Sequence, residues 1–78
     1  MKTITFGRQQ DNDVTVSNHT VSRHHMIIAQ DNDGRIILFD LQSVNGTYVN
    51  GQRVDGTIEL HYGDIVKIGI RLIGNLIS

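Results

Sequence analysis

The sequence predicts an all-β protein, a small antiparallel β-sandwich built from its 78 residues. Short apolar runs rich in isoleucine and valine recur along the chain, and turn residues separate them every several positions. No segment keeps a helical period over about ten residues. Several short strands joined by frequent turns are typical of a sandwich or a barrel.

The first half of the chain predicts four strands. Isoleucine and phenylalanine alternate with threonine over residues 4–6, and valine alternates over residues 14–16. The apolar runs HMIIAQ and RIILFD follow at residues 25–30 and 35–40. The four residues between these runs, DNDG, predict a hairpin loop in which Gly34 is free to take a positive φ.

The second half predicts a tight hairpin and three further strands. Asn50-Gly51 lies between Thr-Tyr-Val and Gln-Arg-Val, the strongest short-range signature of a two-residue type I′ turn. The runs TIEL, IVKI and IRLI follow at residues 57–60, 65–68 and 70–73, and glycine-containing turns separate them.

Composition limits the classes of function. The length predicts a single domain over residues 1–78. The chain has no cysteine, which excludes a disulfide framework and a thiolate site. The chain has seven basic and eight acidic residues, so it lacks the basic excess expected for a nucleic-acid or membrane surface. With no signal-peptide run at the N-terminus, we expect a cytoplasmic protein.

Three polar clusters do not fit the strand pattern. Gly-Arg at residues 7–8 ends the first strand, Ser-Arg-His-His at residues 22–25 precedes the third, and Ser-Val-Asn-Gly-Thr occupies residues 43–47. Loops at one end of a sandwich converge in space and can build one site on a rigid frame. Guanidinium groups, a hydroxyl and an amide together predict an anion receptor, because arginine donates to phosphate oxygens in pairs.

Metal binding and catalysis are weaker interpretations of the same residues. His24 and His25 are adjacent on a strand and point to opposite faces, and their spacing from His19 and His61 matches no zinc pattern. A Ser22–His25 catalytic pair lacks a strained nucleophile turn and an assigned orienting acid. We therefore expect no metal, no cofactor and no enzymatic activity, and a structural role for His25.

Taken together, the clusters resemble the forkhead-associated (FHA) domain, a family that binds phosphothreonine peptides. The resemblance covers nearly the whole chain and is carried by ITFGR at residues 4–8, SRHH at 22–25, DLQSVNGTYVNG at 40–51, GD at 63–64 and IG at 68–69. The order and spacing of these motifs follow the family pattern. Each motif alone is weak, and the combination is specific.

The resemblance implies a division of roles among the candidate residues. Arg8 and Ser22 would contact the phosphate, Arg23 would be a further phosphate donor, and Asn45 would hold the peptide backbone just after the phosphothreonine. The residues implied to support the site are Gly7, His25, Gly46, Asn50 and Gly51. The residues implied to set specificity are His19 and Thr20, together with Val44 at a pocket for the threonine methyl group.

The implied partner is a phosphothreonine-containing protein, either a substrate of a Ser/Thr kinase or the kinase itself. Arg8, Ser22 and Asn45 favour this function, and two departures from the family pattern leave room for an alternative. The strand before Gly-Arg begins at Met1, whereas family members commonly carry one or two earlier strands, so its edge is expected to be open. Val44 stands where the family often has threonine or serine. The alternative is an FHA-like structural or assembly module that associates with other proteins, or with itself, through an edge strand or its surface independently of phosphate.

Overall fold

The computed structural model describes residues 2–77, which form nine short β-strands in two sheets. The strands are β1 (Lys2–Gly7), β2 (Val14–Thr15), β3 (Met26–Gln30), β4 (Ile36–Asp40), β5 (Thr47–Val49), β6 (Gln52–Arg53), β7 (Thr57–Leu60), β8 (Ile65–Ile68) and β9 (Arg71–Asn75). The predicted all-β sandwich is confirmed. Within the described residues, no helix is long and apolar enough to cross a membrane.

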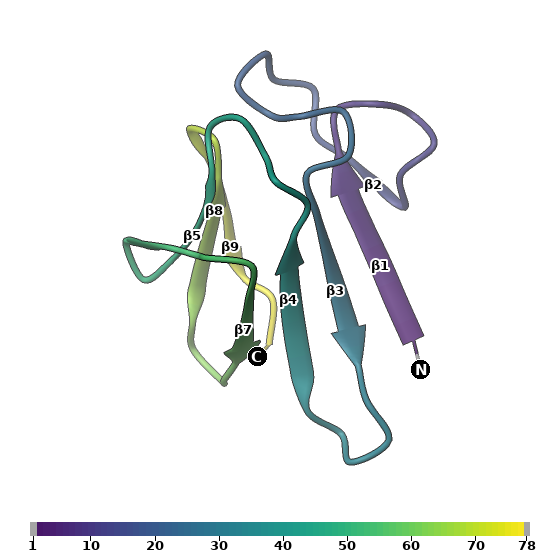
Figure 1. Ribbon diagram of the computed structural model, residues 1–78, viewed down its shortest axis with the longest axis vertical. Helices are drawn as coiled ribbons and strands as arrows, with labels where there is room; N and C mark the ends of the chain where they lie inside the picture. The colour runs from purple at the N-terminus through teal and green to yellow at the C-terminus, as the bar shows by residue number, and fades with distance from the viewer. Residues whose placement is uncertain (1, 78) are drawn as a thin grey trace.

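The two sheets have the strand orders β2-β1-β3-β4-β7 and β6-β5-β8-β9 (Figure 1). All of their strand pairings are antiparallel except that of β1 with β2. These two strands run parallel, with Phe6 opposite Val14 and Gly7 opposite Thr15. A parallel pair needs a crossover rather than a tight turn. The residues between β1 and β2 provide it, and they also form one of the loops at the upper end of the molecule in Figure 1.

Both predicted turns are confirmed. Asn50 and Gly51 have φ angles of 52° and 84°, the positive pair that a type I′ turn requires, and Val49 lies opposite Gln52. Gly34 has a φ of 83° in the loop between β3 and β4. These local signals therefore set the register of two hairpins.

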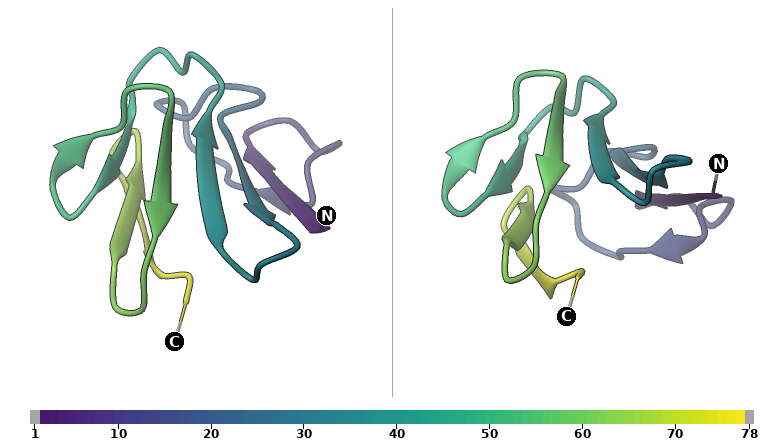
Figure 2. Two further views of the ribbon diagram at one scale, coloured as in Figure 1. Left: turned by 60° about the horizontal axis from the view of Figure 1, so that its bottom comes forward. Right: turned by 90° about the horizontal axis from the view of Figure 1, so that it is seen from below.

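One apolar core fills the space between the two sheets. Figure 2 shows the arrangement of these sheets from two further directions. Its fully buried members include Met26 and Leu38 from the first sheet and Val66 and Ile68 from the second. Val21, 1% exposed, belongs to the same core although it lies in the loop before β3. This loop is thus anchored to the core directly beside Ser22.

The expectation of an open edge at the first strand is wrong for the end of β1 that leads into Arg8. There β1 lies between β2 and β3, and the backbone N–H of Thr5 is bonded to an Asp13 carboxylate oxygen at 2.9 Å. The outer strands of the sheets are β2 and β7 in one and β6 and β9 in the other. Unpaired backbone groups are therefore presented by those strands and by residues 2–4 of β1, which β2 does not cover on the side away from β3.

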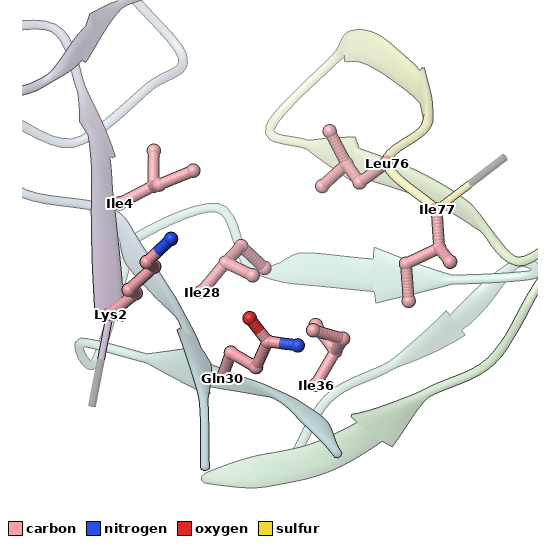
Figure 3. Close-up of a pocket in the computed structure, with 7 residues that line it drawn as sticks. All are labelled: Lys2, Ile4, Ile28, Gln30, Ile36, Leu76 and Ile77. Atoms are coloured by element: carbon pink, nitrogen blue, oxygen red, sulfur yellow. The ribbon is translucent and has the colours of Figure 1, made fainter. Parts of the chain in front are cut away.

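An apolar cavity of about 190 Å³ lies at the opposite end of the sandwich from the Gly7-Arg8 loop (Figure 3). Ile4, Ile28 and Ile36 from the first sheet line it, facing Leu76 and Ile77 from the segment after β9. The cavity is therefore a gap where the two sheets close incompletely, far from the polar loops.

Candidate functional site

The three polar clusters come together at the end of the sandwich where β1 and β4 finish and β3 begins, uppermost in Figure 1. Hydrogen bonds connect all three. The Arg8 N–H donates to the Ser22 carbonyl oxygen at 3.0 Å, and the Val44 N–H donates to the Ser22 hydroxyl oxygen at 3.0 Å. Ser22 is thus the residue at which the loops meet.

Arg8 is held at its inner end and exposed at its outer end. Its Nε donates to the Val21 carbonyl oxygen at 3.0 Å, which leaves both terminal NH₂ groups of the guanidinium for other acceptors. The preceding Gly7 is buried, and a Cβ there would collide with the Arg23 carbonyl oxygen and the Asn12 amide nitrogen. Glycine at this position therefore allows the loop after β1 to pack closely against the loop before β3, which places Arg8 beside Ser22.

The Ser22 hydroxyl proton has no acceptor among residues 2–77. The hydroxyl oxygen of Ser22 already accepts from the Val44 N–H, so its own proton can point outward to an anion. Its backbone N–H donates to Nδ1 of His25 at 3.0 Å. Ser22 is half-buried, and its orientation is fixed on both sides.

His25 is fully buried and connects the loops from below. Because Nδ1 accepts from the Ser22 N–H, the proton lies on Nε2, which donates to the Gly46 carbonyl oxygen at 3.0 Å. Burial lowers the pKa of His25, although the Gly46 carbonyl and the nearby Asp40 carboxylate act in the opposite direction. The ring is therefore neutral near pH 7 and uses both nitrogens.

Asn45 is exposed and reaches across to the loop that precedes β3. Its side-chain N–H donates to the Thr20 carbonyl oxygen at 2.8 Å, leaving its amide oxygen and one N–H to face solvent. The Thr20 hydroxyl bonds to the Asn18 side chain and accepts from the Ile70 N–H at 3.1 Å. That hydroxyl is therefore committed to internal bonds, whereas the neighbouring His19 is exposed.

Arg23 extends into solvent from a firmly held backbone. Its carbonyl oxygen accepts from the Gln9 N–H at 3.2 Å and from the Asn12 side chain at 2.8 Å. Asn12 is buried, and its amide oxygen has no partner within the described residues. His24 pairs with Asp11 of the β1–β2 loop at 2.9 Å. Arg8 and Arg23 thus add two exposed basic residues to the loops that meet at Ser22.

Val44 is 81% exposed, so its side chain forms an open wall beside Ser22 rather than a closed pocket. Gly46 is buried with a φ of 88°, and its carbonyl oxygen accepts from both His25 and the Gly69 N–H. This left-handed conformation is one that glycine adopts without strain. It turns the chain from the Val44-Asn45 loop into β5.

Asn50 and Gly51 lie in the β5–β6 turn, away from the three loops. The Asn50 side chain donates to an Asp64 carboxylate oxygen at 2.9 Å and accepts from the Ile65 N–H at 3.0 Å. A bond from the His61 N–H, together with that from Asn50, lowers the pKa of Asp64. These two residues position β5 against β8 and do not face the polar loops.

Asp40 is a supporting residue that begins the motif at residues 40–51 but was given no role of its own from the sequence. Its carboxylate accepts from the Ser43 hydroxyl at 2.6 Å and the Thr47 hydroxyl at 2.7 Å. Burial works against ionisation, but these hydrogen bonds outweigh it, so the pKa of Asp40 lies below its usual value. The sequence signal for this role was a pair of hydroxyl residues, Ser43 and Thr47, three and seven positions after the aspartate. Their bonds to Asp40 close the loop that carries Val44 and Asn45.

The arrangement is that of a donor surface. Exposed guanidinium N–H groups, a hydroxyl proton and an amide converge from loops that are themselves fixed by bonds to the core. Within residues 2–77, no group of three or more His, Asp or Glu side chains is arranged to hold a metal ion. Such a set of donors is complementary to a doubly charged oxyanion.

Comparison with known proteins identifies the family. Residues 4–69 match the family described as the FHA domain. The chain belongs to the FHA family. This FHA domain is 44% identical over 66 residues to an ABC transporter ATP-binding/permease protein of Mycobacterium tuberculosis, a match that covers 85% of this chain and 7% of that protein.

Solved structures agree with the fold of this FHA domain. It superposes on Mycobacterium tuberculosis EmbR in complex with a low-affinity phosphopeptide, with a TM-score of 0.89 and 33% identity, covering 97% of this chain and 20% of that one. It superposes on the N-terminal FHA domain of S. cerevisiae Rad53 in complex with a phosphothreonine peptide, with a TM-score of 0.81 and 35% identity, covering 88% and 57%. The chain spans less than half the length of the curated relatives that it matches first.

Proposed function

We propose that this FHA domain binds phosphothreonine-containing protein segments through the loops that meet at Ser22. The observation that carries the proposal is the bonding around that residue. Ser22 accepts from Val44, Arg8 is tied to Val21, and the outward-facing donors of both side chains remain available. A phosphothreonine dianion offers the acceptors that these groups lack.

The proposed roles follow from what each side chain has left to donate. The fork of Arg8 and the hydroxyl of Ser22 bind the phosphate, and Arg23 adds a second guanidinium from the exposed flank. Asn45 retains an amide oxygen and one N–H, the pair needed to bond a peptide backbone. Because the loops are tied to buried groups before a ligand arrives, little conformational entropy is lost on binding.

The proposed biological partner is a protein phosphorylated on threonine by a Ser/Thr kinase, or that kinase itself. Relatives in complex with a phosphothreonine peptide or a phosphopeptide support this assignment by similarity of fold and sequence. The proposal gives the domain a binding role without catalysis, in the cytoplasm, as a single module over residues 1–78.

Calorimetry with a phosphothreonine peptide library tests the proposal. Wild-type protein should bind phosphorylated members and ignore the same peptides without phosphate, and Arg8→Ala should lose that binding. Arg35→Ala is the matched control, since it removes the same charge from an exposed position in the β3–β4 loop at the other end of the molecule. Equal binding of the library by wild type and Arg8→Ala would refute a phosphate receptor at these loops.

A second candidate function is self-association through β9, the outer strand of the second sheet. Leu72 on β9 and Ile70 just before it are both 66% exposed, so this edge combines unpaired backbone with apolar side chains. A second copy would pair along β9. Sedimentation should then show a concentration-dependent dimer that Leu72→Lys abolishes, whereas a monomer at all concentrations would eliminate this function.

A further inference from the structure

Tyr48 lies between two basic side chains on the outer face of the second sheet. It is registered opposite Arg53 of β6 on one side and opposite Lys67 of β8 on the other. Its neighbours Thr47 and Val49 point into the core, so Tyr48 points outward, and directly paired side chains share a face. The Lys67 ammonium lies 4.7 Å from the centre of the Tyr48 ring. We call Arg53, Tyr48 and Lys67 the basic row.

The basic row begins beside the loop that carries Asn45. A Cβ added at Gly46 would meet Nε of Arg53 at 2.9 Å and Cε1 of Tyr48 at 3.2 Å. The guanidinium of Arg53 and the edge of the tyrosine ring therefore both lie against Gly46, the residue that follows Asn45. In Figure 1 this is where β5 leaves the loop from β4 and runs beside β8.

The charges of the basic row are not neutralised by residues 2–77. Among residues 2–77, no carboxylate oxygen lies within 4.0 Å of a nitrogen of Arg53 or Lys67. The strands β5, β6 and β8 contain no aspartate or glutamate. A surface of one sign next to a binding site attracts a ligand of the opposite sign and selects against one of the same sign.

We propose that the basic row is a second subsite of the peptide-binding surface, which accepts the carboxylate of an aspartate or glutamate flanking the phosphothreonine. This inference rests on the proposed function and adds a specificity to it. Arg53 makes the contact because its guanidinium lies against Gly46, the residue after Asn45, and Lys67 strengthens the field from its position over Tyr48. Because Arg53 lies against Gly46, the residue that follows Asn45, the acidic residue is expected close to the phosphothreonine in the peptide sequence.

Matched phosphothreonine peptides test the subsite. Aspartate and, separately, asparagine are placed at each position from three before to three after the phosphothreonine, and dissociation constants are measured by calorimetry at low salt. Wild type should prefer aspartate to asparagine about two- to fivefold at one or more positions, the range of exposed ion pairs. The preference should shrink as salt is raised, because these charges are solvent-exposed.

Variants separate recognition from a structural role of the same side chains. Arg53→Gln should reduce the aspartate-to-asparagine ratio to about one, and Arg53→Lys should retain part of it. Lys67→Gln should lower the ratio by less, and Arg35→Gln, remote from the loops, should leave it as in wild type. A purely structural Arg53 would change both affinities by one factor and leave the ratio intact. Thermal melts identify any variant that fails to fold. If Arg53→Gln does not fold, the aspartate-to-asparagine ratio of Lys67→Gln tests the subsite instead.

The two proposals fail in different ways. If wild type binds phosphothreonine peptides but gains nothing from aspartate at any position, or if the gain survives in both Arg53→Gln and Lys67→Gln, the subsite is refuted alone. If wild type binds no phosphothreonine peptide, the proposed function is refuted and the subsite falls with it.

Discussion

The ring of His25 donates from Nε2 to the carbonyl oxygen of Gly46, 21 positions away in the sequence, at 3.0 Å, and so connects two loops. The same ring accepts from the Ser22 N–H, so one buried residue sets the positions of both the hydroxyl and the Asn45 loop. The geometry of the exposed donors is therefore determined by a side chain that no ligand can touch.

Replacing His25 should destabilise the fold and weaken phosphopeptide binding together. His25→Ala leaves the Ser22 N–H and the Gly46 carbonyl without their partner and opens a cavity, at a cost of about 2–4 kcal/mol in unfolding free energy. His25→Gln should cost less, because its amide can still donate toward Gly46. Denaturant titration measures both, with His24→Ala as control, since His24 is exposed and pairs only with an exposed carboxylate.

For His24→Ala we expect a change within about 0.5 kcal/mol, as for other surface substitutions. A His25→Ala variant as stable as His24→Ala would show that the buried ring does not hold the loops.

Stability should fall on mild acidification because of His25. Its pKa in the folded state is lowered by burial, so below the ordinary value of about 6.5 the unfolded chain takes up a proton that the folded protein does not. The contribution is fully present above about pH 6.5 and is lost as pH falls toward the folded-state pKa. Denaturant midpoints of wild type and His25→Gln should therefore converge between pH 7.5 and pH 5.5.

His19, His24 and His61 occur in both proteins, so they cancel in that comparison. A gap between wild type and His25→Gln that widens on acidification would mean that the buried ring is held in its charged form.

The strands and hairpins were predictable because their signals are local. Alternating apolar residues, and the Asn50-Gly51 dipeptide with positive φ at both residues, need only neighbouring sequence to be interpreted. The parallel pairing of β1 with β2 was not predictable, since it depends on how the loop between them folds over Asn12. That loop is fixed by a bond from Asn12 to the Arg23 carbonyl, a partner far along the chain.

The candidate site likewise has features that local sequence predicts and features that depend on distant residues. The motifs around Arg8, Ser22 and Asn45 marked loops that do meet at one end of the sandwich. The internal bonds that fix them were hidden, because they join distant positions. The Thr20 hydroxyl accepts from Ile70, 50 residues away, and this bond turns a residue that the family resemblance implies for specificity inward. The contact of Arg53 with Gly46 was hidden for the same reason.

Arg8 and Ser22 should be needed for binding but not for folding. Each supplies charge-assisted hydrogen bonds of about 1.5–3 kcal/mol, so Arg8→Ala and Ser22→Ala should each weaken a phosphothreonine peptide about 10- to 150-fold. The Arg8 side chain is exposed, and melting temperatures should change little. Calorimetry and thermal melts on the same samples check this, and a substantial melting shift for Arg8→Ala would assign it a structural role.

Phosphothreonine should be preferred over phosphoserine, and Val44 is the residue that tests it. The two phosphates are equivalent, so a surface made only of Arg8, Ser22 and Arg23 would bind both alike. Val44 stands beside the Ser22 hydroxyl through its backbone bond at 3.0 Å, and its side chain is 81% exposed and apolar. The threonine methyl can therefore be covered by the isopropyl group of Val44.

Burial of one methyl group contributes about 0.8 kcal/mol, which corresponds to a preference of roughly fourfold for phosphothreonine. An open wall supports a value of this size rather than the larger discrimination of a closed pocket. Val44→Ala should reduce the ratio toward one while leaving the phosphoserine affinity nearly unchanged, because the backbone bond to Ser22 is retained. Val44→Thr should keep the methyl contact and add a hydroxyl, tightening both peptides. Calorimetry on peptides that differ only in serine or threonine gives the ratio directly, and equal constants for the two in wild type would mean that Val44 covers no methyl group.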